Sequence, residues 1–170
     1  MSEFKVERQD GSLLLNVQLK LELGPALEDA LVKGLAVHFV ADAEVMRDRW
    51  YWYDKKLGMV SRYYRLAYQP LTRRWRLNVS SEPIAHSGVT SSLSQNFESL
   101  REAIDVIRRQ TSWKVADMSD IDLDARQYVA YRFRLDVSQL PRPFQIAAGN
   151  QADWRLDIAR SLRLTSDMVR

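Results

Sequence analysis

The sequence predicts a mainly β protein, built as an antiparallel β-sandwich or a strongly curved sheet of about seven to eight strands with two short helices. In most candidate strands, apolar and polar residues alternate with a period of two, which is typical of strands with one buried and one solvated face. Parallel strands buried on both faces would instead read as continuous apolar runs. Turn signals also separate the strands at short intervals. An α+β arrangement is the alternative.

The first elements form a predicted hairpin followed by a helix. Residues 4–8 alternate, Asp10-Gly11 is a strong short-turn signal, and a longer alternation then covers residues 13–23. Gly24-Pro25 ends that strand. Pro25 at a first helical position and Gly34 as a stop predict a helix of about ten residues.

A second hairpin is predicted in the middle of the chain, after a strand over residues 37–45. Pairing Tyr68 with Trp75 around a turn at residues 70–73 places six side chains on one face: Tyr64, Leu66, Tyr68, Trp75, Leu77 and Val79. The other face then holds Arg65, Gln69, Arg74, Arg76 and Asn78, because the side-chain period of a strand is two residues.

The remaining elements follow from caps, alternation and prolines. Residues 80–94 predict a loop or irregular edge strand, and Ser99 with Glu102 forms a capping box that begins a helix ending near Arg109. A short apolar segment covers residues 113–116, and alternation over residues 128–137 predicts a strand. Residues 140–144, with two prolines, predict an extended connector, either packed on the core or presented to a partner. Trp154, Leu156 and Ile158 suggest a last strand.

Composition limits the chemistry that the chain can perform. Its 170 residues fit a single domain over 1–170 and contain no cysteine, which removes disulfides and thiolate chemistry. His38 and His86 are the only histidines; neither shows metal-ligand spacing, and His38 is predicted to lie on a strand surface. The acidic loop at residues 117–124 lacks the glycine and terminal glutamate of a calcium loop. We therefore expect no catalytic residues, no metal and no cofactor, and no apolar run is long enough for a transmembrane segment.

The charge is concentrated in one segment. Residues 47–76 contain nine basic and two acidic residues together with three Trp and five Tyr, whereas the rest of the chain contains 16 basic and 20 acidic residues. Such asymmetry attracts anionic partners. Two sets of candidate binding residues lie here: Arg49, Trp50 and Trp52, and Arg65, Arg74 and Arg76.

Each candidate set has a functional and a structural interpretation. The first set suits stacking against sugar rings or bases, or else its rings fill a core layer and cover a sheet edge. The second set suits an anionic polymer or a phosphate headgroup, or else it is a solvated sheet face that discourages edge pairing. Nucleic acid is not the expected partner, because no nucleic-acid-binding motif accompanies the charge.

Six separated patches of the sequence resemble, in the same order, the bacterial family of unknown function DUF4390. They are residues 25–31 with Gly34, residues 49–54, residues 64–66 with 71–73, residues 93–95 with Phe97, Trp113 with residues 115–117, and residues 140–145 with Trp154. Members of this family usually begin with a signal sequence, whereas this chain begins Met1-Ser2-Glu3-Phe4. The resemblance implies a mature or trimmed form of an exported, periplasmic protein; without export, the chain would be cytoplasmic.

Taken together, these features predict a non-enzymatic binding or accessory module of the bacterial envelope. Its cationic aromatic hairpin would meet another protein or an anionic envelope component. The alternative is a hydrolase acting on envelope carbohydrate through two carboxylates, which would lie about 5 to 10 Å apart in a deep cleft.

Overall fold

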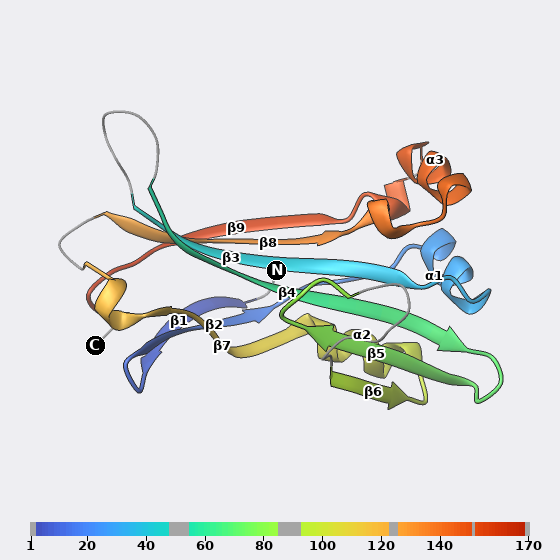
Figure 1. Ribbon diagram of the computed structural model, residues 1–170, viewed down its shortest axis with the longest axis horizontal. Coiled ribbons are helices and arrows are strands. Elements are labelled where there is room, and N and C mark those ends of the chain that lie inside the picture. The colour runs from blue at the N-terminus through green and yellow to red at the C-terminus, as the bar shows by residue number, and fades with distance from the viewer. Residues whose placement is uncertain (1–2, 48–54, 85–92, 123–125, 151, 169–170) are drawn as a thin grey trace.

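The computed structural model describes residues 3–47, 55–84, 93–122, 126–150 and 152–168. Within these residues the chain forms nine strands in two antiparallel sheets, together with three α-helices (Figure 1). The predicted mainly β class is therefore confirmed. The described strands exceed the predicted seven to eight, because the short apolar segment at residues 113–116 belongs to a full strand, β7 (Arg109–Asp117).

The smaller sheet has the strand order β1-β2-β7 and contains the predicted first hairpin. β1 (Glu3–Gln9) pairs with β2 (Ser12–Gln18), and both turn residues, Asp10 and Gly11, have positive φ angles of 51° and 74°. That backbone is what a two-residue hairpin turn requires, and Asp-Gly adopts it readily. The turn signal in the sequence therefore identified this hairpin correctly.

The predicted second strand is shorter than its alternation. β2 ends at Gln18, although Leu19 and Leu21 remain buried. The Leu19 amide donates to the Arg108 carbonyl at 2.9 Å, and Arg108 Nε donates to the Leu21 carbonyl at 2.8 Å. Polar groups of Arg108, at the end of a helix, thus bond the backbone of residues 19–21 in place of a neighbouring strand. The alternation of apolar residues can therefore continue beyond the end of β2.

The larger sheet has the order β6-β5-β4-β3-β8-β9. Its strands are β3 (Val37–Arg47), β4 (Lys55–Gln69), β5 (Arg74–Ser80), β6 (Leu93–Phe97), β8 (Gln127–Leu135) and β9 (Asp157–Arg163). In the β4–β5 hairpin, Tyr68 lies opposite Trp75 and Leu66 opposite Leu77, so the predicted register is confirmed.

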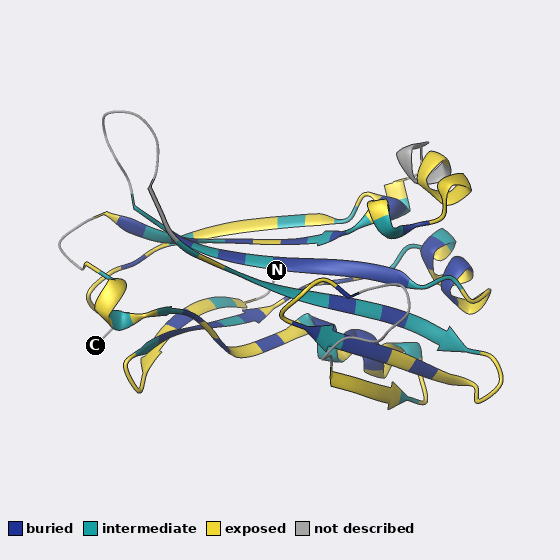
Figure 2. Ribbon diagram, in the orientation of Figure 1, coloured by how far each residue is buried: buried dark blue, intermediate teal, exposed yellow. Residues whose placement is uncertain are grey.

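The core lies between the two sheets. Leu13, Leu15 and Val17 of β2 belong to the same buried cluster as the inward residues of β3 and β8. Figure 2 shows β3 as the most deeply covered strand. In addition, Arg62 of β4 lies over the Trp113 ring of β7 at 4.8 Å, a cation–π contact between the sheets.

One polar contact is buried inside this core. The Tyr131 hydroxyl donates to Gln110 Oε1 at 2.9 Å, and Gln110 Nε2 donates to the Ile107 carbonyl at 3.2 Å. Gln110 is fully buried, so these bonds satisfy groups that water cannot reach.

Two of the helices begin where the sequence predicts. α2 (Leu100–Arg108) carries the predicted capping box, with the Glu102 amide donating to Ser99 Oγ at 3.2 Å and the Ser99 amide donating to Glu102 Oε2 at 3.3 Å. α1 (Pro25–Val32) begins at Pro25 as predicted. Its N-cap residue, Gly24, has no side chain to accept from the helix.

A distant carboxylate supplies the cap that Gly24 lacks. The Ala26 amide donates to Asp153 Oδ2 at 3.1 Å, and a Cβ atom on Gly24 would overlap the Asp153 carboxylate. Asp153 belongs to the short 3₁₀-helix η3 (Ala152–Trp154), far along the chain. The helix start therefore depends on tertiary structure, and Gly24 makes the close approach possible.

Two predictions for the C-terminal third are wrong. Residues 142–144 are not an extended connector but the first turn of α3 (Arg142–Asn150), where Pro143 is tolerated because the amides of a first helical turn have no intrahelical partner. Trp154 lies in η3, and the last strand, β9, begins only at Asp157. Phe144 of α3 approaches Trp154 with a ring-centroid distance of 6.4 Å, and α1 and α3 lie at the same end of the molecule (Figure 1).

In the described part of the chain, no helix combines the length and apolar character needed to cross a bilayer.

Candidate functional site

The face of the larger sheet turned away from the smaller sheet, here called the outer face, carries the candidate site. Alternate residues of each strand point to it. Because His38 pairs with Arg65, Arg65 with Asn78, and Asn78 with Ser94, these four residues form one row across β3, β4, β5 and β6. The adjacent row contains Ala67, Arg76 and Asn96.

Arg65, Arg74 and Arg76 share this outer face, as the sequence predicted. Arg74 and Arg76 are exposed on β5, whereas Arg65 of β4 is only partly exposed. The other candidate set, Arg49, Trp50 and Trp52, lies outside the described residues.

Arg65 and His38 line a hollow of about 280 Å³ at the end of the sheet. Its other walls come from two connecting segments: Leu35 and Ala36 before β3, and Ser138, Gln139, Leu140 and Pro141 after β8. His38 is only 6% exposed, so its predicted position on a strand surface is wrong, although its predicted face is right. The chain after β8 first continues the pairing with β3, with the Asp136 amide donating to the His38 carbonyl at 2.8 Å, and its residues 138–141 then line the same hollow as His38.

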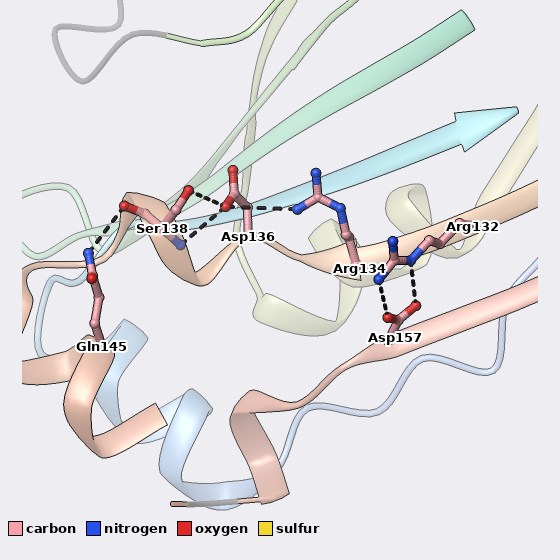
Figure 3. Close-up of polar contacts among 6 residues, drawn as sticks. All are labelled: Arg132, Arg134, Asp136, Ser138, Gln145 and Asp157. Atoms are coloured by element: carbon pink, nitrogen blue, oxygen red, sulfur yellow. Dashed lines mark hydrogen bonds and ion pairs between the residues drawn. The ribbon is translucent and has the colours of Figure 1, made fainter. Parts of the chain in front are cut away.

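A chain of polar contacts fixes the wall of this hollow (Figure 3). The wall contains the 3₁₀-helix η2 (Val137–Gln139), where Asp136 Oδ1 accepts from the Ser138 amide at 3.1 Å and from Ser138 Oγ at 2.5 Å. Gln145 Nε2 of α3 donates to the Ser138 and Leu140 carbonyls at 3.2 and 2.6 Å. The side chains of Asp136, Ser138 and Gln145 thus hold the wall in place.

The described residues give Arg65 no carboxylate that would balance its charge. Burial, and secondly the nearby positive charge of Arg76, lower the pKa of Arg65. The buried Arg65 Nε has no acceptor among the described residues. Asp136, which is near the wall, lies 3.9 Å from Arg134 Nη1 instead. Because a cation removed from water is stabilised by a negative partner, this arrangement is suited to receive an anion.

A second hollow on the outer face contrasts with the first. It has a volume of about 480 Å³ over β3, β8 and β9, and its lining includes Asp42, Glu44 and Arg132. Here the ionic groups have partners: Ser61 Oγ donates to Asp42 Oδ1 at 2.6 Å, and Arg132 makes two hydrogen bonds to Asp157 (Figure 3). The hydrogen bond from Arg132 lowers the pKa of Asp157.

Among the described residues, no group of three or more His, Asp or Glu side chains is arranged to hold a metal ion. Sequence alternation identified the outer face and its three arginines. It could not identify the hollow, because the wall residues 138–141 lie more than seventy positions along the chain from Arg65. The sequence did contain one indication of the hollow: a basic residue, Arg65, and a histidine, His38, which the sheet places beside each other on adjacent strands.

Comparison with known proteins gives a family but no function. No curated protein and no solved structure matches the chain. Residues 1–163 match the family model described as "Domain of unknown function (DUF4390)". The match includes every strand described above and confirms the resemblance seen in the separated sequence patches. The chain therefore belongs to the DUF4390 family.

Proposed function

We propose that this protein is a non-enzymatic binding or accessory module of the bacterial envelope, and that it docks an acidic segment of another protein on the outer face of the β4–β5 hairpin. The observation that carries the proposal is Arg65, a partly buried guanidinium in a hollow, whose Nε has no acceptor among the described residues and whose pKa is lowered by burial and by Arg76. The periplasmic location rests on the export that is usual in the family.

The shape of the hollow favours a carboxylate side chain over a broad polyanionic surface. A hollow of about 280 Å³ around one guanidinium admits a small group, and a carboxylate binds a guanidinium through two parallel hydrogen bonds. Arg74 and Arg76 are exposed and contribute longer-range attraction, which raises the association rate more than the final affinity.

Retention on an immobilised acidic polypeptide tests the proposal. Polyglutamate should retain the wild-type protein at low salt, and retention should weaken markedly at physiological salt because exposed charges are screened. Arg65→Gln should reduce retention strongly, and joint replacement of Arg65, Arg74 and Arg76 by Glu should abolish it. Arg101→Gln on α2 removes the same charge from another exposed position and serves as the matched control.

The far-ultraviolet circular dichroism and unfolding midpoint of each variant establish that it is folded. If the triple Glu variant is folded and retained like the wild type, the outer face is not the docking surface. Retention by anionic lipid vesicles instead of polyglutamate would indicate a lipid headgroup as the partner. A pull-down from envelope extract, with the triple Glu variant as control, would then identify the natural partner.

A hydrolase acting on envelope carbohydrate is the second candidate, and one observation favours it. Asp42 and Glu44 are two residues apart on β3, so they share the outer face at a backbone separation of about 7 Å and both line the larger hollow. Catalytic carboxyl groups lie about 5 to 10 Å apart, a separation that side chains on neighbouring outward positions of one strand can reach. Release of reducing sugar from purified envelope glycan by the wild type, and its loss in both Asp42→Asn and Glu44→Gln, would favour this candidate over the binding module.

A further inference from the structure

The edges of the two sheets differ in how well they are protected against pairing with another strand. Natural edge strands commonly carry charges that oppose such pairing. β1, β7 and β9 follow this rule: each contains both acidic and basic residues, such as Glu7 and Arg8 in β1. β6 has the sequence Leu-Ser-Gln-Asn-Phe and is the edge strand without a charged side chain among the four edges that the structure describes.

β6 is also open to solvent along its length. Its first four residues are exposed, and Leu93 is 77% exposed (Figure 2). One side of β6 pairs with β5 from Leu93 to Phe97. In the described structure no strand pairs with the other side, so backbone donors and acceptors of this edge are available to an incoming chain.

We propose that β6 is a strand-addition edge, where an extended acidic segment of a partner protein pairs with the backbone and extends the larger sheet to a seventh strand. This inference rests on the proposed function and specifies how the acidic segment binds. Main-chain hydrogen bonds would supply affinity, and alternate side chains of the segment would supply specificity.

The register of the sheet places acidic side chains of such a segment near the arginines. Residues of the added strand that lie opposite Ser94 and Asn96 point to the outer face, because opposite residues in a sheet share a face. Asn96 in turn lies opposite Arg76. Two strand spacings of about 4.8 Å therefore separate Arg76 from an acidic residue facing Asn96, a distance that the two long side chains can bridge.

Charge argues against a second copy of this chain as the occupant. If two β6 strands paired antiparallel about a twofold axis perpendicular to the sheet, the outer faces of both copies would be continuous. Arg74 and Arg76 of each copy would then approach those of the other, and like charges on one face oppose pairing. The side chains of an acidic segment would instead be attracted by Arg74 and Arg76 on the outer face.

Selection from a displayed library of random dodecapeptides tests the proposal on the full chain. Recovered peptides should carry acidic residues at alternate positions, with β-branched or aromatic residues between them. Binding of a selected synthetic peptide to the wild-type protein should slow amide hydrogen exchange in β6. Recovery of peptides without this alternation, or unchanged exchange in β6 when a selected peptide is bound, would overturn the proposal.

Two proline variants provide the functional test. Neighbouring residues of an edge strand direct their amides alternately to the adjacent strand and outward, so one of Gln95→Pro and Asn96→Pro removes an outward donor and the other a bond to β5. The outward variant is recognised by its unchanged unfolding midpoint. It should bind the selected peptide at least about tenfold more weakly, and binding within about twofold of wild type would overturn the proposal.

If both variants are unfolded, the exchange measurement on the wild-type protein decides. The polyglutamate experiment separates this proposal from the one on which it rests. Failure of strand addition alone would leave polyglutamate retention dependent on Arg65. Failure of the proposed function would make retention insensitive to the triple Glu replacement.

Discussion

Leu77 and Arg76 are neighbours in β5 whose side chains lie on opposite faces, and their truncation provides a direct test of the sheet's register. Leu77 is fully buried opposite Leu66, whereas Arg76 is exposed opposite Ala67. Leu77→Ala removes three carbon atoms from the core, a transfer loss of about 2.4 kcal/mol at roughly 0.8 kcal/mol each. The residual cavity adds up to about 1.5 kcal/mol, depending on how far the site collapses. We expect a total loss of about 2 to 4 kcal/mol.

Arg76→Ala should change the free energy of unfolding by less than about 0.5 kcal/mol, because exposed side chains contribute little. It also removes a positive charge that lowers the pKa of Arg65, so the small change is expected to favour the folded state. Urea unfolding measures both variants. With a slope of about 2 kcal/mol per molar urea, Leu77→Ala should lower the midpoint by about 1 to 2 M while that of Arg76→Ala stays close to wild type. Equal losses at the two positions, with unchanged slopes, would refute the assignment of inside and outside.

Four further predictions concern a buried hydrogen bond, the ionisation of two buried tyrosines, a helix cap and metal content. Tyr131→Phe should cost about 1 to 3 kcal/mol in urea unfolding, since it leaves buried Gln110 Oε1 without its donor; a loss below about 0.5 kcal/mol would contradict the buried bond. Burial also raises the pKa values of Tyr64 and Tyr131 above the usual value near 10, so the unfolded chain releases these protons first. The stability they contribute is therefore present below about pH 10 and is lost as pH rises further, and spectrophotometric titration should show two phenols that ionise above the usual range of tyrosine. Asp153→Ala should cost about 1 kcal/mol through loss of the α1 cap, and Gly24→Ala at least as much because its Cβ displaces the same carboxylate; wild-type midpoints for both would exclude this capping contact. Elemental analysis should find no stoichiometric transition metal, and chelator should leave the thermal midpoint unchanged; one bound metal per chain would overturn the expectation.

Local sequence determined the hairpins, because their physical causes act between residues close in the chain. A two-residue side-chain period and a short turn leave one register in which Tyr68 meets Trp75, and the structure has that register. The same reasoning placed Arg65, Arg74 and Arg76 on one face. Asp10-Gly11 fixed the first turn through its tolerance of positive φ, and the capping box fixed the start of α2.

Long-range packing decided what the alternation could not. Side-chain parity placed His38 on the outer face, but its burial depends on neighbours such as residues 138–141, which line the same hollow and come from a distant part of the chain. Residues 138–141 also lie beside Arg65, which therefore lines a hollow and is only partly exposed. Pro141 and Pro143 led to the wrong prediction of an extended connector, since a proline is as compatible with the first turn of a helix as with an extended chain.

The sequence by itself therefore determined which face of each strand is apolar, and the tertiary structure decided what lies over each face. The first depends on side-chain alternation, a property of neighbouring residues. The second depends on contacts between residues far apart in the chain, such as Asp153 with the start of α1 and Ser138 with the Arg65 hollow. Burial of a charged group is a property of that second kind: the partial burial of Arg65, whose Nε has no acceptor among the described residues, depends on segments that are distant in the sequence.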